Sequence, residues 1–142
     1  MSLAGAEQYK SLTLSHIRNA DGALIVYDIS DIGSFKSIHE WKEIVKSSNN
    51  EDIVIFLLGN KKDLVNERKI KCEKGKNISK LENFDYFTEC SAKTNENIME
   101  MFHEFYKKVY EKNKEKIIEK RNNNKILFEM KQRDMEGKCC EC

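Results

Sequence analysis

The chain has 142 residues, which is one domain's worth at most. Charged residues make up 35 % of it, and 25 basic against 24 acidic side chains leave a formal net charge of +1, so the charge does not indicate a nucleic-acid-binding protein. No apolar run approaches the ~20 residues of a membrane-spanning helix, and no signal peptide opens the chain. Five cysteines, three of them in the last four positions, form no disulfide framework and indicate a reducing, cytosolic compartment.

Three apolar segments predict β-strands. The first covers residues 23–27, and Asp28 begins the loop after it. The second, residues 53–58, is a continuous run rich in β-branched side chains, which is typical of a strand buried on both faces of a parallel α/β sheet. Residues 84–90 are the third.

The segments between and after these strands predict helices. Residues 34–45 carry apolar side chains at helical spacing, with Ser34 as a plausible N-cap. A helix is also expected over roughly 71–82, where Gly75 weakens the pattern. The longest helix is expected from Asn95 to about Lys120, and the Lys/Glu/Asn-rich stretch beyond Tyr110 should fray. Residues 121–138 are predicted to be a disordered linker.

A polar cluster, Gly59-Asn60-Lys61-Lys62-Asp63-Leu64, follows the second strand. Open α/β sheets bind ligands at this place, beyond the carboxyl ends of their strands. One carboxylate can accept both parallel N–H donors of guanine, which is the role that Asp63 would have. Asn60 offers an amide, and the stem of Lys61 can lie over the purine face. A polar turn without function is the alternative.

The third strand is followed by Ser91-Ala92-Lys93. Asn-Lys-x-Asp and Ser-Ala-Lys occur together, in this order, in the guanine pocket of small GTPases, so the chain resembles a small GTPase of the Ras superfamily. Residues 9–13 (Tyr-Lys-Ser-Leu-Thr) and 24–30 (Leu-Ile-Val-Tyr-Asp-Ile-Ser) resemble segments of the Rab branch. The resemblance implies an incomplete doubly wound, mostly parallel α/β sheet without its first strands. It also implies a partial GTPase domain over 1–117 and a flexible tail over 118–142.

The resemblance implies a guanine-nucleotide site that holds GTP or GDP with Mg²⁺, its base bound by the residues of the two motifs: Asn60, Lys61, Asp63, Ser91, Ala92 and Lys93. A remnant of the family's second switch is expected in Ala4, Gly5, Ala6 and Glu7. Ala6 stands where the family has the glutamine that orients the attacking water, and an alanine methyl cannot do this. The phosphate loop, Gly-x-x-x-x-Gly-Lys-Ser/Thr, and the first-switch threonine are not found in these residues, so the Mg²⁺ ligands are missing and no catalytic residue is expected.

The chain ends in Cys139-Cys140-Glu141-Cys142. Rab proteins commonly end in Cys-x-Cys or Cys-Cys, so Cys140 and Cys142, or Cys139 and Cys140, are expected to carry two prenyl groups. Two lipids give stable membrane anchoring, whereas one gives only reversible binding. Glu141 argues against a single-lipid Cys-a-a-X motif, and a metal-binding cysteine cluster is the competing interpretation.

The resemblance therefore implies a Rab-type switch in vesicle traffic on the cytoplasmic face of intracellular membranes. Its expected partners are guanine nucleotide, the escort and prenylation machinery, and the GDP-dissociation inhibitor that extracts it to the cytosol. A catalytically inactive, lipid-anchored interaction module and a truncated gene product remain alternatives. Because the strand at residues 23–27 would lose a neighbour, an exposed apolar edge and poor stability are expected.

Overall fold

The sheet is organised around β2 (Val54–Asn60), which pairs on both of its edges with parallel strands. The computed structural model describes residue 17 and residues 20–47 and 53–137, with no description of the side chains of 116, 117 and 120–137. Contacts divide the chain into one unit up to Val109 and a second from Tyr110.

Three parallel strands lie in the order β1-β2-β3, with β1 at Gly22–Asp28 and β3 at Tyr86–Glu89. The register places Gly22 opposite Val54 and Phe56 opposite Tyr86. All three predicted strands are confirmed, and the six residues 54–59 are buried, as the continuous apolar run predicted. The parallel sheet agrees with an incomplete small-GTPase α/β fold.

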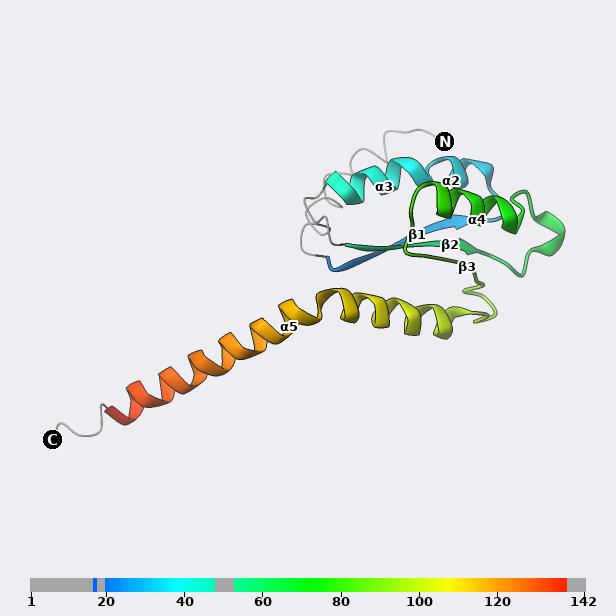
Figure 1. The fold of residues 1–142 in the computed structure, drawn as a ribbon. Coiled ribbons are helices and arrows are strands. Elements are labelled where there is room, and N and C mark those ends of the chain that lie inside the picture. The colour runs from blue at the N-terminus through cyan, green and yellow to red at the C-terminus, as the bar shows by residue number, and fades with distance from the viewer. Residues whose placement is uncertain (1–16, 18–19, 48–52, 138–142) are drawn as a thin grey trace, which may run out of the picture. The chain divides into compact units, whose positions relative to one another are not determined.

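Helices cover both faces of this sheet (Figure 1). One apolar cluster joins Ile25, Tyr27 and Ile55 of the sheet to helices α2, α3 and α4, while the other joins Phe56 to Met101 of α5. Alternating residues of β2 therefore face opposite layers, which is why this strand is apolar throughout.

The single helix predicted over 34–45 is two helices, α2 (Ile32–Lys36) and α3 (Ile38–Ser47). The prediction that Ser34 is the N-cap is wrong. Asp31 caps α2, because its carboxylate accepts hydrogen bonds from the N–H groups of Gly33 at 2.9 Å and Ser34 at 3.2 Å. The Ser34 hydroxyl instead accepts from the Asp28 N–H at 3.0 Å, which links α2 to the end of β1.

Helix α4 spans Cys72–Leu81, close to its predicted bounds, and a short 3₁₀ turn, η1, covers Val65–Glu67. Helix α5 spans Ile98–Gly137. The predicted helix end near Lys120 and the predicted disordered linker are therefore wrong for residues 121–137. The sequence contains no proline, and its many Lys and Glu residues are good helix formers, so nothing local ends the helix.

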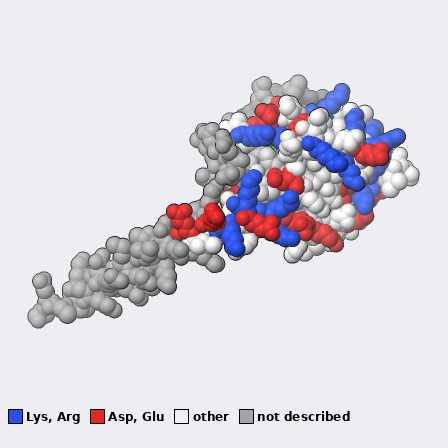
Figure 2. Space-filling view, viewed as in Figure 1, with Lys and Arg blue, Asp and Glu red and all other residues white. Residues whose placement is uncertain are grey.

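Basic and acidic side chains are intermingled over the viewed face of the first unit (Figure 2). The viewed face therefore has no large, purely basic patch of the kind that attracts a polyanion. In the described part of the chain, no helix combines the length and the apolar character needed to cross a bilayer.

Tyr27 is buried where β1, β2 and α4 meet, and its hydroxyl has no hydrogen-bond partner among the described residues. Glycines make the space for it: a Cβ on Gly59 would lie 2.8 Å from this hydroxyl oxygen, and one on Gly75 would lie 2.5 Å from it. Burial raises the pKa of Tyr27, and the nearby charge of Glu89 raises it further. The hydroxyl is therefore desolvated without compensation.

Replacing this hydroxyl tests the packing. We expect Tyr27→Phe to raise the free energy of unfolding by about 1 kcal/mol, because it removes an unpaired buried polar group without changing the ring. Urea denaturation followed by Trp41 fluorescence measures this. The matched control is Tyr106→Phe, whose ring is 66 % exposed and which should stay within about 0.5 kcal/mol of the wild type. A clear loss of stability in Tyr27→Phe would show that the hydroxyl has a partner in solution.

Candidate functional site

The loops that follow β2 and β3 lie side by side at the carboxyl edge of the sheet. Their backbones are hydrogen bonded directly: the Cys90 N–H donates to the Gly59 carbonyl at 2.8 Å, and the Lys62 N–H donates to the Cys90 carbonyl at 3.0 Å. Lys61 turns the chain sharply between them with a φ of 66°, an unusual value for a residue other than glycine. Parallel pairing of β2 with β3 thus brings the two predicted motifs together.

Asn60 links the two loops through its side chain. Its Oδ1 accepts hydrogen bonds from the Lys61 N–H at 2.7 Å and from the Ala92 N–H at 3.1 Å. Both hydrogen bonds use Oδ1 of the Asn60 amide. The two N–H donors are on Nδ2, on the other side of the amide group, and therefore point away from Lys61 N–H and Ala92 N–H. The side chain of Asn60 thus holds the loop after β2 against the loop after β3.

Asp63 is held by the second loop. The Ser91 hydroxyl donates to Asp63 Oδ1 at 2.5 Å and accepts from the Thr94 N–H at 3.1 Å. Ser91 is completely buried, and its own N–H donates to the Glu96 carbonyl at 3.1 Å. The buried Ser91 hydroxyl therefore holds the carboxylate of Asp63 in position through Oδ1. The second carboxylate oxygen, Oδ2, remains able to accept hydrogen bonds from a ligand.

These loops line a cavity of about 260 Å³. Five of the six residues predicted to bind a base border it, and Ser91 supports it from the interior. The lining residues are Asn60, Lys61, Asp63, Leu64, Ala92 and Lys93. The cavity is bordered by a carboxylate acceptor, by amide donors and by apolar surface. This combination suits a flat heteroaromatic ring that carries its own N–H donors.

Sequence reasoning missed the partner of Lys61. Its ammonium group lies 2.6 Å from Asp28 Oδ2, and Asp28 also accepts from the N–H and hydroxyl of Ser30 at 2.8 and 2.6 Å. Burial alone would raise the pKa of Asp28, but the hydrogen bonds and charge of Lys61 and the bonds from Ser30 hold it below its ordinary 3.8. The register, which places Asp28 opposite Asn60, is the signal that could have revealed this pair.

A second ion pair, between Arg68 and Glu89, lies at the carboxyl end of β3. Arg68 donates to both carboxylate oxygens of Glu89, at 2.7 and 2.8 Å, and also to the Ile70 carbonyl at 2.9 Å. The hydrogen bonds to Glu89 raise the pKa of the guanidinium group. This bidentate pair connects the segment after η1 to the end of β3, immediately before Ser91.

The other predicted residues lie outside the described part of the chain. They are Ala4, Gly5, Ala6 and Glu7 of the second-switch remnant and the terminal Cys139, Cys140 and Cys142. Among the residues that the structure describes, no group of three or more His, Cys, Asp or Glu side chains is placed to hold a metal ion.

The parallel sheet with helices on both faces and a cavity at its carboxyl edge defines an α/β protein of the small-GTPase fold class, and sequence comparison supports this class. A model described as the Ras family matches residues 2–111, so the chain belongs to the Ras family of small GTPases. Ras-related protein SEC4 from Candida albicans, and that from its strain WO-1, are each 36 % identical to this chain over 115 residues. These alignments cover 81 % of this chain and 54 % of each relative, so the chain spans about half the length of the relatives it matches.

The Asp28–Lys61 pair gives stability a defined pH dependence. A carboxylate whose pKa is lowered in the folded state stabilises that state above its unfolded pKa, and this contribution is lost as pH falls through the folded value. We expect wild type to exceed Asp28→Asn in free energy of unfolding at pH 5–7, with the difference shrinking below about pH 3.8.

Urea titrations at a series of pH values measure the difference. Lys61→Met provides the control, because removing the ammonium group should reduce the pH-dependent part of the Asp28→Asn effect. A difference between wild type and Asp28→Asn that stays constant from pH 7 to pH 3 would contradict the assignment.

Proposed function

We propose that this chain binds the guanine base of GTP or GDP in the cavity between the loops after β2 and β3. The observation that carries the proposal is the Ser91–Asp63 hydrogen bond, which fixes a carboxylate at the border of a base-sized cavity. The bound species is proposed to be a guanine nucleotide, as expected for the Ras family.

Asp63 would read the base through its carboxylate. The ring N–H and the exocyclic amino group of guanine point in parallel, so both can donate to one carboxylate. Adenine offers no such pair and would leave Asp63 desolvated without a partner, which produces specificity.

The other groups would complete the base site. The amide of Asn60 is placed to donate, and the Ala92 N–H is the donor that we assign to the guanine oxygen, sharing or leaving its 3.1 Å bond to Asn60. The ion pair with Asp28 anchors the end of Lys61, so that its apolar stem can cover one ring face. Lys93 borders the same cavity.

In this proposal, the described residues supply recognition of the base. Phosphate binding and GTP hydrolysis are activities of the whole small GTPase, and no residue of this chain is assigned to the hydrolytic step.

The cellular role that we propose is that of a Rab-type component of vesicle traffic. Prenyl groups on Cys140 and Cys142, or on Cys139 and Cys140, would anchor it to the cytoplasmic face of intracellular membranes. The escort and prenylation machinery and the GDP-dissociation inhibitor are the protein partners implied by this chemistry. No nucleic acid is expected as a partner.

A second candidate function is a lipid-anchored interaction module without GTPase activity. Ala6 favours it, because a methyl group cannot orient a water molecule as the family's glutamine does. The two functions differ in whether nucleotide controls the protein, so a nucleotide titration separates them.

Replacement of the base-reading carboxylate tests the main proposal. We expect a fluorescent GDP analogue to bind the purified chain and Asp63→Ala to weaken that binding by roughly 10- to 100-fold, because charge-assisted hydrogen bonds to the base are lost. Asp63→Asn should shift preference towards xanthosine diphosphate, whose carbonyl can accept from the new amide. Fluorescence anisotropy, with and without Mg²⁺, measures the affinity of the wild type and of Asp63→Ala for the analogue.

Asp21→Asn is the matched control, because Asp21 is an exposed aspartate outside the cavity. It should bind the analogue like the wild type. Equal binding by wild type and Asp63→Ala would refute the base site, and absence of binding by either would favour the module without nucleotide control.

Lipid attachment is tested at the terminal cysteines. We expect prenyltransferase with its escort protein to add two geranylgeranyl groups to the wild type and at most one to Cys140→Ser, the cysteine common to both expected pairs. Intact-protein mass spectrometry counts the groups, and vesicle flotation reports anchoring. Cys72→Ser controls for an exposed thiol elsewhere in the chain and should still receive two. An unmodified wild-type chain would contradict the lipid anchor.

A further inference from the structure

Lys62 stands between Lys61 and Asp63, yet its side chain is not among those that border the base-sized cavity. Its ammonium group instead donates to Glu96 Oε1 at 2.5 Å. Glu96 lies between the end of β3 and the start of α5, and it does not border the cavity either. This ion pair therefore joins the loop after β2 to the loop after β3 from outside the space that a ligand would fill.

Backbone hydrogen bonds of the same two loops hold both members of the pair. The Lys62 N–H donates to the Cys90 carbonyl at 3.0 Å, and the Glu96 carbonyl accepts from the Ser91 N–H at 3.1 Å. An exposed ion pair usually contributes little, because two flexible side chains have to be ordered to form it. Here the two main chains are already fixed, so only the side chains remain to be ordered.

The turn that carries Glu96 is itself fixed on both sides. Asn95 and Asn97, which precede and follow it, have φ values of 63° and 59°. Asparagine adopts this left-handed conformation more readily than most other residues do. The Asn97 side chain also donates to the Glu89 carbonyl at 2.7 Å, which ties the turn to the end of β3. The carboxylate of Glu96 is thus presented from a defined backbone position.

The ion pair is connected to the carboxylate that would read the base. Lys62 directly precedes Asp63 in the chain, and Asp63 Oδ1 accepts from the Ser91 hydroxyl at 2.5 Å. Ser91 in turn donates its N–H to the carbonyl of Glu96. Lys62, Asp63, Ser91 and Glu96 therefore form a closed ring of contacts across the two loops. The loops can separate here only when the ion pair and the Ser91–Asp63 hydrogen bond are both broken.

We propose that Lys62 and Glu96 are positioning residues that slow the release of a bound guanine base by keeping the two loops together. The inference rests on the proposed function, in which Asp63 of one loop and Ala92 of the other contact the base. Release requires these loops to part, and each further contact between them lowers the population of the open state. Because neither residue borders the cavity, the pair changes the release rate without changing which base is preferred.

Reversal of one charge tests the proposal. We expect Glu96→Lys to raise the dissociation rate of a fluorescent GDP analogue roughly fivefold, because two ammonium groups then repel each other across the loops. Stopped-flow displacement by excess GDP measures this rate. An added cation would by itself retain an anionic nucleotide, so faster release identifies the contact between the loops. The double variant Lys62→Glu/Glu96→Lys restores the pair with opposite polarity and should release the analogue at nearly the wild-type rate.

Amide hydrogen exchange of the ligand-free chain reports the same contact without nucleotide. The N–H groups of Lys62 and Ala92 are bonded across the loops, so their exchange should also accelerate in Glu96→Lys and slow again in the double variant. The amide of Leu57, which is fully buried in β2, reports global unfolding and should not change. Glu100→Lys is the matched control, because it makes the same charge change at an exposed carboxylate on α5 and should alter neither rate.

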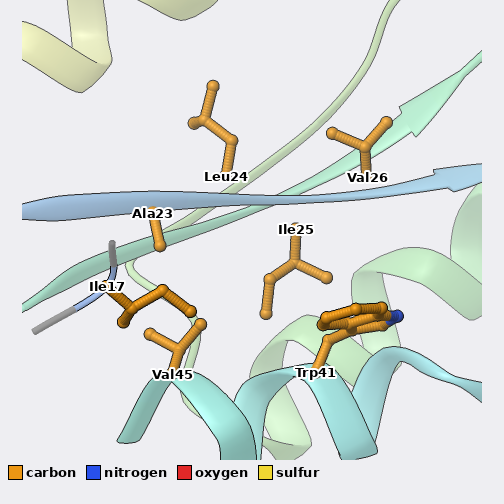
Figure 3. Close-up of a pocket in the computed structure, with 7 residues that line it drawn as sticks. All are labelled: Ile17, Ala23, Leu24, Ile25, Val26, Trp41 and Val45. Atoms are coloured by element: carbon orange, nitrogen blue, oxygen red, sulfur yellow. The ribbon is translucent and has the colours of Figure 1, made fainter. Parts of the chain in front are cut away.

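Trp41, the single tryptophan, checks that the variants are folded. It lies on α3 and borders a different cavity together with Ile25 and Val45 (Figure 3). Its fluorescence therefore follows urea unfolding without a direct contribution from the two loops. Glu96→Lys should stay within about 0.5 kcal/mol of the wild type in free energy of unfolding, as is usual for an exposed substitution.

Unchanged exchange at Lys62 and Ala92 in Glu96→Lys would overturn the proposal, whether or not nucleotide binds. Faster exchange without faster release would also overturn it, and so would a double variant that releases the analogue as fast as Glu96→Lys. A wild type that binds no analogue would refute the proposed base site and the role in release with it. In that case the exchange rates show separately whether the ion pair holds the loops together.

Discussion

Burial of β2 on both faces is the constraint on which the rest of the first unit depends. Phe56 and Leu57 are adjacent and both fully buried, yet they belong to opposite apolar clusters. A strand of this kind requires helices above and below it and a parallel neighbour on each side. Since parallel strands end at the same edge, the residues after β2 and β3 have to meet there, and this meeting creates the candidate site.

The site itself is a small hydrogen-bonded assembly between two loops. Ser91 is buried and positions Asp63, while Asn60 holds the backbone of Ala92. Neither loop could hold its ligand-facing groups in place alone, because each depends on a contact from the other. Two ion pairs connect these loops to further parts of the fold. Asp28–Lys61 joins the loop after β2 to the end of β1, and Arg68–Glu89 joins the end of β3 to the segment after η1. Preorganised polar groups of this kind favour specific recognition over adaptable binding.

The apolar runs located all three strands, and the two motifs after them pointed to five residues that line one cavity at the edge of the sheet. Contacts that depend on register could not be predicted in this way, and Asp28 was missed because it is distant in sequence from Lys61. The break at Ser37 was missed because helical periodicity continues across it, while the cap at Asp31 sets a different start. The length of α5 was underestimated because its polar stretch lacks an apolar stripe, although it also lacks any residue that would end a helix.

The central claim is that these residues recognise guanine as a base, and a nucleoside titration tests it without phosphate or metal. Amide resonances of Lys61, Asp63 and Ala92 in ¹⁵N-labelled chain can be followed by NMR as guanosine, inosine and adenosine are added. We predict the largest shifts and tightest binding with guanosine, weaker binding with inosine, which lacks the exocyclic amino group, and little effect of adenosine. Equal responses to guanosine and adenosine, or shifts outside this cavity only, would contradict the account.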